Sequence, residues 1–177
     1  MFIKKIQINN FGKLKNKEIE FKSGINVIYG ENESGKSTLL DFISSMFYGI
    51  NKNKNGKEIS NYDKYLPWKG KEFSGKIIYY LDNNEKYEVY RNFNKKNPQI
   101  FDKNANDISK DFSQDKTYGN MFFYEQTKVD EELFNMSMVI HQQEVKLNTK
   151  EQSTLIQKAS NIMLTGEDNV SYKKILR

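Results

Sequence analysis

The nine residues at 30–38, GENESGKST, restrict the fold of this chain more tightly than any other stretch of the sequence. They match the spacing Gly-x4-Gly-Lys-[Ser/Thr] without a mismatch, which is typical of loops that wrap a phosphate group. Glycines allow tight backbone turns and a close approach to an anion, and a following helix presents free N–H groups and its positive dipole end. The sequence therefore predicts a nucleotide phosphate site built from a strand, a loop and a helix.

Both flanks of this loop have the required pattern. Residues 25–29 form a short apolar, β-branched run, which predicts a strand buried on both faces. Apolar residues recur at helical spacing from Leu39 to Phe47, and Gly49 provides a stop. Because strand and helix signals flank the loop, they favour a phosphate site over a chance match in a surface turn.

The residue types indicate separate roles within the loop. Lys36 is expected to bridge two phosphates of a bound triphosphate, and the Ser37 hydroxyl is expected to bind Mg²⁺. The predicted nucleotide-binding residues all belong to the loop and the start of the helix: Gly30, Asn32, Glu33, Ser34, Gly35, Lys36, Ser37 and Thr38.

The rest of the first two thirds of the chain has mainly strand patterns. Half-buried strands are expected over 2–8 and 18–22, and a further strand over 99–101. A β-hairpin is expected over 76–93. Within it Asp82 follows four apolar residues, as a Walker B acid would, but the Asp-Asn-Asn-Glu sequence makes a turn the simpler interpretation.

The C-terminal part returns to helix patterns. A short helix capped by Asp130 is expected over 129–134. Residues 138–140 are strand-like, and an amphipathic helix over 155–163 is expected to end at Gly166.

Composition limits the class of protein. The chain has 177 residues, enough for one substantial core. It contains no cysteine, which excludes disulfides and thiolate metal sites. Its single histidine, His141, excludes a histidine-rich metal site. No apolar run approaches the roughly 20 residues that span a bilayer, so we expect a cytoplasmic protein without a membrane partner. The net charge of +5 is compatible with a nucleic-acid partner, but the lysines are spread along the whole chain.

The order of these motifs resembles a known family. Residues 8–12, 19–21 and 24–38 are similar to the N-terminal head segment of SMC and SbcC-type ATPases. The pairs Asn32-Glu33 and Pro67-Trp68, and the run YRNF at 90–93, are most similar to YhaN-like AAA-family DNA repair ATPases.

The resemblance implies an α/β P-loop NTPase head of the ABC/SMC type, here its N-terminal lobe, with a mixed sheet, an antiparallel β subdomain and C-terminal helices. We expect a single head half-domain over 1–177. Strands, loop and helix would occupy 1–50, and an insertion with the β subdomain 51–128. A glutamine loop and helices leading toward a coiled coil would occupy 129–177.

The resemblance also implies residues for catalysis. Gln142 falls at the family's glutamine loop, where its amide oxygen would approach Mg²⁺ and help to place the attacking water; Gln143 is the alternative. Lys36 and Gln142 are thus the expected catalytic residues, and Ser37 and Gln142 the expected metal ligands, for ATP and Mg²⁺. Family members often carry a basic residue directly after the Asn-Phe pair, near the nucleotide. Here Gly12 stands at that position and Lys13 follows, which argues against a basic contact from this turn.

The family's signature segment and its acidic strand do not follow Gln142 within these 177 residues. The resemblance therefore implies that the C-terminal half of the same polypeptide completes the site, within a head-to-head homodimer that acts on DNA in repair or chromosome maintenance. The fragment alone is expected to bind ATP without hydrolysing it.

Two other classes stay open. A self-contained P-loop kinase or GTPase would need its own acidic Mg²⁺ partner and, for GTP, an Asn-Lys-x-Asp guanine reader, which NKNK at 51–54 does not match. A non-enzymatic basic module would stack bases on the hairpin tyrosines Tyr79, Tyr80, Tyr87 and Tyr90, although alternation predicts that half of these face the core.

Overall fold

The computed structural model of the protein describes residues 1–50, 52, 59–67, 72–115, 119–139, 153–154, 156–158 and 160–161. The chain divides into two units, Met1–Phe122 and Phe123–Arg177, and each is described by itself. The single half-domain expected over 1–177 stays a prediction.

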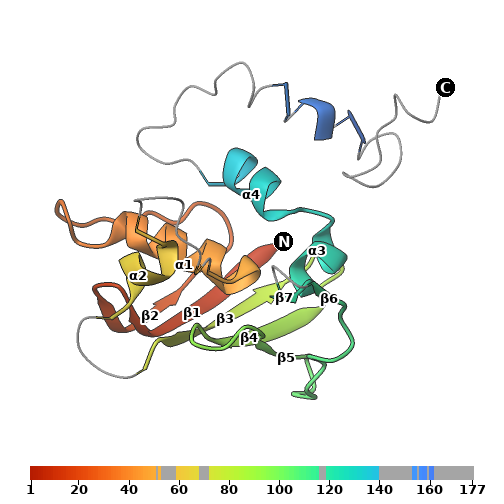
Figure 1. The fold of residues 1–177 in the computed structure, drawn as a ribbon, viewed down its shortest axis with the longest axis horizontal. Coiled ribbons are helices and arrows are strands. Elements are labelled where there is room, and N and C mark those ends of the chain that lie inside the picture. Colours follow the sequence, from red (N-terminus) through yellow and green to blue (C-terminus); the bar gives the residue numbers. More distant parts are fainter. Residues whose placement is uncertain are drawn as a thin grey trace. The chain divides into compact units, whose positions relative to one another are not determined.

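A five-stranded sheet with the order β2-β1-β3-β4-β5 forms the base of the first unit (Figure 1). Its strands are β1 (Phe2–Phe11), β2 (Leu14–Glu20), β3 (Ser74–Tyr80), β4 (Lys86–Asn92) and β5 (Gln99–Phe101). Every pairing in this sheet is antiparallel, so the antiparallel subdomain and the β3–β4 hairpin are confirmed. No parallel pairing of the expected mixed sheet occurs among the described strands. A separate two-stranded sheet joins β6 (Gln114–Asp115) to β7 (Gly119–Asn120).

One face of the large sheet packs against α1 (Lys36–Tyr48), beside which lies the short helix α2 (Asn61–Tyr65) (Figure 1). Alternating strand residues such as Ile6, Ile77 and Val89 are fully buried beneath α1. The Phe11 ring lies 5.3 Å from Phe42 of α1 and 5.1 Å from Phe93, centre to centre. Burial of such a side chain stabilises the fold by about 2 kcal/mol, so this aromatic cluster fixes α1 on the sheet.

The helix α2 lies inside the expected insertion and was not predicted. Ser60 is its N-cap, and the Ser60 Oγ accepts a hydrogen bond from the Asp63 N–H at 3.1 Å. A serine followed three residues later by an acid is a known helix start, so a signal for α2 was present in the sequence. Trp68 lies outside the described residues.

The strand expected at 25–29 is not formed, which is the largest departure from the sequence prediction. These residues form no regular secondary structure and pair with no strand of the described chain. Ile25 is 95% exposed, Val27 84% and Tyr29 95%. An apolar run buried on both faces needs a strand beside it and layers above and below it. Both edges of β1 are already taken by β2 and β3, and no described strand pairs with 25–29.

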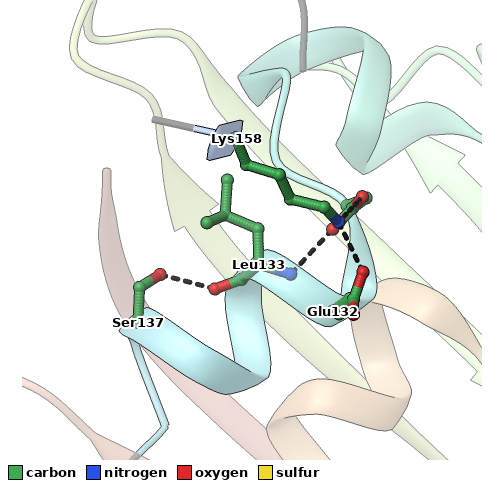
Figure 2. A network of polar contacts seen from close by, with 5 residues as sticks. Glu132, Leu133, Ser137 and Lys158 are labelled. Carbon is green, nitrogen blue, oxygen red and sulfur yellow. Dashed lines mark hydrogen bonds and ion pairs between the residues drawn. The ribbon is translucent and has the colours of Figure 1, made fainter. Parts of the chain in front are cut away.

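In the second unit, α4 (Glu131–Ser137) begins where the sequence predicts. The Asp130 carboxylate caps it by accepting from the Leu133 N–H at 2.7 Å. Figure 2 shows the Lys158 ammonium reaching the start of α4, where it donates to Asp130 at 2.6 Å and to Glu132 at 2.7 Å. This ion-pair network ties the segment around Lys158 to α4.

Other predictions for this unit have mixed outcomes. The described residues between 153 and 161 are helical, as expected for the helix at 155–163, and the expected end at Gly166 lies outside the described residues. The strand expected at 138–140 is wrong for its described part, because Met138 is the C-cap of α4 and Val139 belongs to no strand. The helix α3 (Phe122–Thr127) was not predicted. No helix among the described residues is both long and apolar enough to cross a membrane.

Candidate functional site

The loop at 30–38 connects the exposed segment 25–29 to α1. Its residues 31–34 are exposed, and α1 starts at Lys36 directly behind them. The structure thus brings the predicted phosphate-binding residues together at the N-terminal end of α1. Their binding roles stay predictions.

The start of α1 has no cap of its own. Gly35 is the N-cap residue with φ +102° and ψ +17°, and no side chain accepts a hydrogen bond from the first turn. The first N–H groups of a helix need acceptors, and the positive end of the helix dipole favours an anion there. The first intrahelical bond is donated by the Leu39 N–H to the Gly35 carbonyl at 2.9 Å. The preceding N–H groups can therefore donate to a phosphate.

Side chains approach two glycines of the loop closely. A Cβ at Gly30 would lie 2.6 Å from Ser34 Oγ, and a Cβ at Gly35 would lie 2.7 Å from Leu14 Cδ2. Real Cβ atoms do not approach other atoms this closely, and the φ of Gly35 also disfavours any side chain. Glu33 has φ +63°, a left-handed conformation unusual for a glutamate. The loop therefore has the tight curvature that a phosphate cradle needs.

Lys36 folds back across the loop. Its Nζ donates to the Gly30 carbonyl and to the Glu31 carbonyl, both at 2.7 Å. The ammonium and the free N–H groups of the first turn thus belong to the same end of α1. Ser37, the expected Mg²⁺ ligand, is exposed in this turn.

Several other candidates are resolved differently. Asp82 lies in the β3–β4 turn, as expected, and its carboxylate accepts a hydrogen bond from the Met1 ammonium. Tyr79 is fully buried and stacks on Tyr87 at 5.6 Å, so it cannot stack on a base. Gln142, Gln143 and His141 lie outside the described residues. No group of three or more histidine, aspartate or glutamate side chains that could hold a metal occurs in the part of the chain that is described.

Sequence reasoning missed what holds α1 in place. Arg91 of β4 is 2% exposed, and its Nε donates to the Met46 carbonyl at 3.1 Å near the end of α1. Burial lowers the pKa of Arg91 to about 10, which reflects the cost of removing its charge from water. In the middle of α1, the Asp41 carboxylate accepts a hydrogen bond from the Tyr65 hydroxyl. Burial, together with this hydrogen bond, raises the pKa of Tyr65. The run YRNF at 90–93 includes Arg91, but it was only a point of resemblance to YhaN-like proteins and gave no sign of a contact with α1.

Comparison with known proteins agrees with the family predicted from the phosphate-loop motif and its flanking residues. A family model described as an AAA domain matches residues 5–176. The chain is 29% identical over 140 residues to the DNA double-strand break repair Rad50 ATPase of Nanoarchaeum equitans, a match that covers 73% of this chain and 18% of the relative. It is also 38% identical over 71 residues to the uncharacterized protein YhaN of Bacillus subtilis, covering 40% of this chain and 6% of the relative.

Among solved structures, the recombination mediator RecF with ATP superposes with a TM-score of 0.47 at 20% identity, covering 93% of this chain and 39% of that chain. The chain spans less than a fifth of the two sequence relatives named above. The family match extends over nearly the whole chain, and the relatives confirm the predicted resemblance to SMC/SbcC-type and YhaN-like proteins. The chain thus belongs to the AAA domain family, as an N-terminal head segment of the SMC/ABC type.

Proposed function

We propose that this chain binds ATP at the loop 30–38 and serves as the N-terminal nucleotide-binding part of an ATP-hydrolysing DNA repair protein. The observation that carries this proposal is the uncapped start of α1 behind a tightly curved loop, with Lys36 folded across it. Free N–H groups, a helix dipole and a lysine are the groups that bind a nucleotide phosphate.

A magnesium ion would fit this loop only in part. The Ser37 hydroxyl is exposed in the first turn of α1 and is a suitable oxygen ligand, whereas the described residues offer no group of three or more carboxylates that could hold a metal ion. When bound, Mg²⁺ would neutralise negative charge on the triphosphate. Ser37 would thus hold the ion together with phosphate oxygens and with Gln142, the proposed glutamine-loop residue. The choice between Gln142 and Gln143 belongs to the same proposal.

The C-terminal half of the same polypeptide is the proposed source of the missing parts. The exposed apolar run at 25–29 supports this, because such a run is suited to pairing with further strands. A second copy would meet the first head-to-head, and the assembly would act on DNA in the cytoplasm. The Rad50 relative is described as a DNA double-strand break repair ATPase, which supports the DNA assignment. Hydrolysis would need these added parts, so the 177-residue chain alone should turn ATP over at background rates.

The test is nucleotide binding by isothermal titration calorimetry with MgATP. Lys36→Ala removes the ammonium that would contact the phosphates, and charge-assisted bonds of this kind contribute about 1.5–3 kcal/mol each. We expect the Kd to rise by about a hundredfold. Lys95→Ala, an exposed lysine on the turn after β4, is the matched control and should bind like the wild type. Equal affinity in Lys36→Ala and wild type, or no binding by the wild type, would refute the proposal.

A further inference from the structure

The short helix α2 belongs to the segment between α1 and β3, which contributes no residue to the predicted phosphate site. Its last residue, Tyr65, is 6% exposed, and the Tyr65 ring stacks on the ring of Phe11 in β1 at 4.7 Å. The Tyr65 carbonyl accepts a hydrogen bond from the Gly12 N–H at 2.7 Å. The end of α2 is thus fixed on the turn between β1 and β2.

The side chain of Tyr65 reaches a second element. Its hydroxyl donates to the carboxylate of Asp41, which lies in the half of α1 nearer the phosphate loop. A hydrogen bond to an ionised carboxylate is about twice as strong as a neutral one, and it is stronger away from bulk water. Tyr65 therefore joins the β1–β2 turn to α1 through two separate hydrogen bonds, one at its backbone carbonyl and one at its hydroxyl.

The two elements that Tyr65 joins meet at the phosphate loop. A Cβ at Gly35 would lie 2.7 Å from Leu14 Cδ2, and a Cβ at Gly12 would lie 3.4 Å from Thr38 Cγ2 in the first turn of α1. The uncapped N–H groups that would bind the phosphate belong to this first turn. A shift of α1 against the β1–β2 turn would change the angles at which these N–H groups reach a phosphate, and hydrogen bonds weaken steeply as their angles change.

We propose that Tyr65 is a positioning residue of the nucleotide site, which holds the start of α1 in its binding geometry by bridging Gly12 and Asp41. The proposal rests on the proposed function of the loop and adds to it a residue from α2. Tyr65 does not need to touch the nucleotide for this role. Because coupling between two sites is reciprocal, a nucleotide bound at the start of α1 should in turn hold α2 more firmly in place.

The first experiment measures MgATP affinity by calorimetry well below the melting temperature, so that every variant is folded. Tyr65→Phe removes the hydroxyl and keeps both the ring against Phe11 and the carbonyl for Gly12. We expect the Kd to rise about fivefold. Asp41→Ala removes the acceptor and should give a similar rise. The double variant should bind no more weakly than either single variant, because both changes break the same bridge.

Tyr62→Phe is the matched control, because it removes one hydroxyl from the same short helix. The Tyr62 hydroxyl donates to Asn94 Oδ1 at 2.7 Å, on the turn after β4 rather than on α1. Each tyrosine variant loses one hydrogen bond, so both should lower the melting temperature by about 2–4 °C. Only Tyr65→Phe should also weaken MgATP binding, which separates a positioning role from a purely structural one.

The second experiment measures the reciprocal effect by amide hydrogen exchange. Saturating MgATP should slow the exchange of the α2 amides in the wild type, and this protection should be lost in Tyr65→Phe. Exchange in α2 that is equally fast with and without MgATP in the wild type would refute the coupling.

The affinities distinguish failure of this inference from failure of the proposed function. If Tyr65→Phe binds like the wild type while Lys36→Ala loses binding, the inference is overturned and the proposed function stands. Equal losses in Tyr65→Phe and Tyr62→Phe would overturn the inference as well, because they would indicate a general loosening of α2. Additive losses in the double variant would do the same, since Tyr65 and Asp41 would then act separately. If the wild type does not bind MgATP, both the inference and the proposed function are overturned.

Discussion

Arg91 is the residue on which the position of α1 depends most. Its guanidinium donates to the carbonyls of Met46 at 3.1 Å, Lys96 at 3.3 Å and Phe47 at 3.4 Å. Two of these carbonyls belong to the last turn of α1, where a cation also opposes the negative end of the helix dipole. The same helix carries the phosphate loop at its other end. Arg91 thus anchors the nucleotide-binding element to β4.

Arg91→Lys should destabilise the fold while keeping the charge. A lysine ammonium cannot spread its donors over three separate carbonyls as a planar guanidinium does, so buried acceptors would lose their partners. We expect the free energy of unfolding to fall by about 2–4 kcal/mol, measured by urea denaturation followed by circular dichroism. Lys95→Ala on the nearby turn should change it by less than about 0.5 kcal/mol. An unchanged urea midpoint in Arg91→Lys would show that the hydrogen bonds from Arg91 to these carbonyls do not hold α1 in place.

At the scale of single elements, the start of α4 concentrates negative charge. Asp130 caps the helix, and Glu131 and Glu132 follow in its first turn. Lys158 pairs with Asp130 and Glu132. Burial raises the pKa of Glu131, and the neighbouring Asp130 charge raises it further. The ionisation of Glu131 therefore opposes folding.

Glu131→Gln should stabilise the chain at neutral pH. A raised carboxyl pKa means that the folded state holds the proton more tightly than the unfolded state does. The contribution to stability is therefore greatest below the ordinary value of 4.5 and is lost as pH rises through the raised pKa. We expect a gain of up to about 1 kcal/mol at pH 7 and none at about pH 4, from thermal unfolding at both pH values.

The control for this prediction is Glu132→Gln in the same helical turn. It removes an ion pair with Lys158, so it should leave stability unchanged or lower it at pH 7. Equal melting temperatures for Glu131→Gln and wild type at pH 7 would contradict the inference that burial of the ionised Glu131 carboxylate destabilises the fold.

For the whole molecule, the segment 25–29 is the most informative feature. It leads straight into the phosphate loop, and Ile25, Val27 and Tyr29 expose most of their apolar surface. Extended apolar segments without a partner strand favour association with other chains. The segment therefore needs further strands, which we propose come from the rest of the polypeptide.

The combined substitution Ile25→Thr, Val27→Thr and Tyr29→Thr tests this role. In the 177-residue chain it should reduce self-association, measured by size-exclusion chromatography with light scattering, and leave the melting temperature unchanged because these side chains are exposed. In a longer polypeptide that contains the C-terminal half, the same substitution should lower stability by several kcal/mol through lost burial. Amide exchange at 25–29 that is equally fast with and without the C-terminal half would rule out pairing.

The sequence by itself determined the features that depend on near neighbours. The loop spacing at 30–38, the helix from Lys36 to the stop at Gly49, the β3–β4 hairpin and the Asp130 cap were all predictable, because turns, caps and periodic patterns act over a few residues. The short helix α2 was also within reach, through Ser60 and Asp63.

The tertiary structure alone decided the features that depend on distant partners. The run at 25–29 has the pattern of a buried strand, but burial requires a neighbouring strand, and no described strand pairs with this run. Arg91 shows no sign in the sequence that it caps α1, 44 to 45 residues away. The bridge that Tyr65 makes between Gly12 and Asp41 likewise arises only when the β1–β2 turn packs against α1. A sequence pattern specifies which side chains should be buried or charged, and only the folded chain decides what they meet.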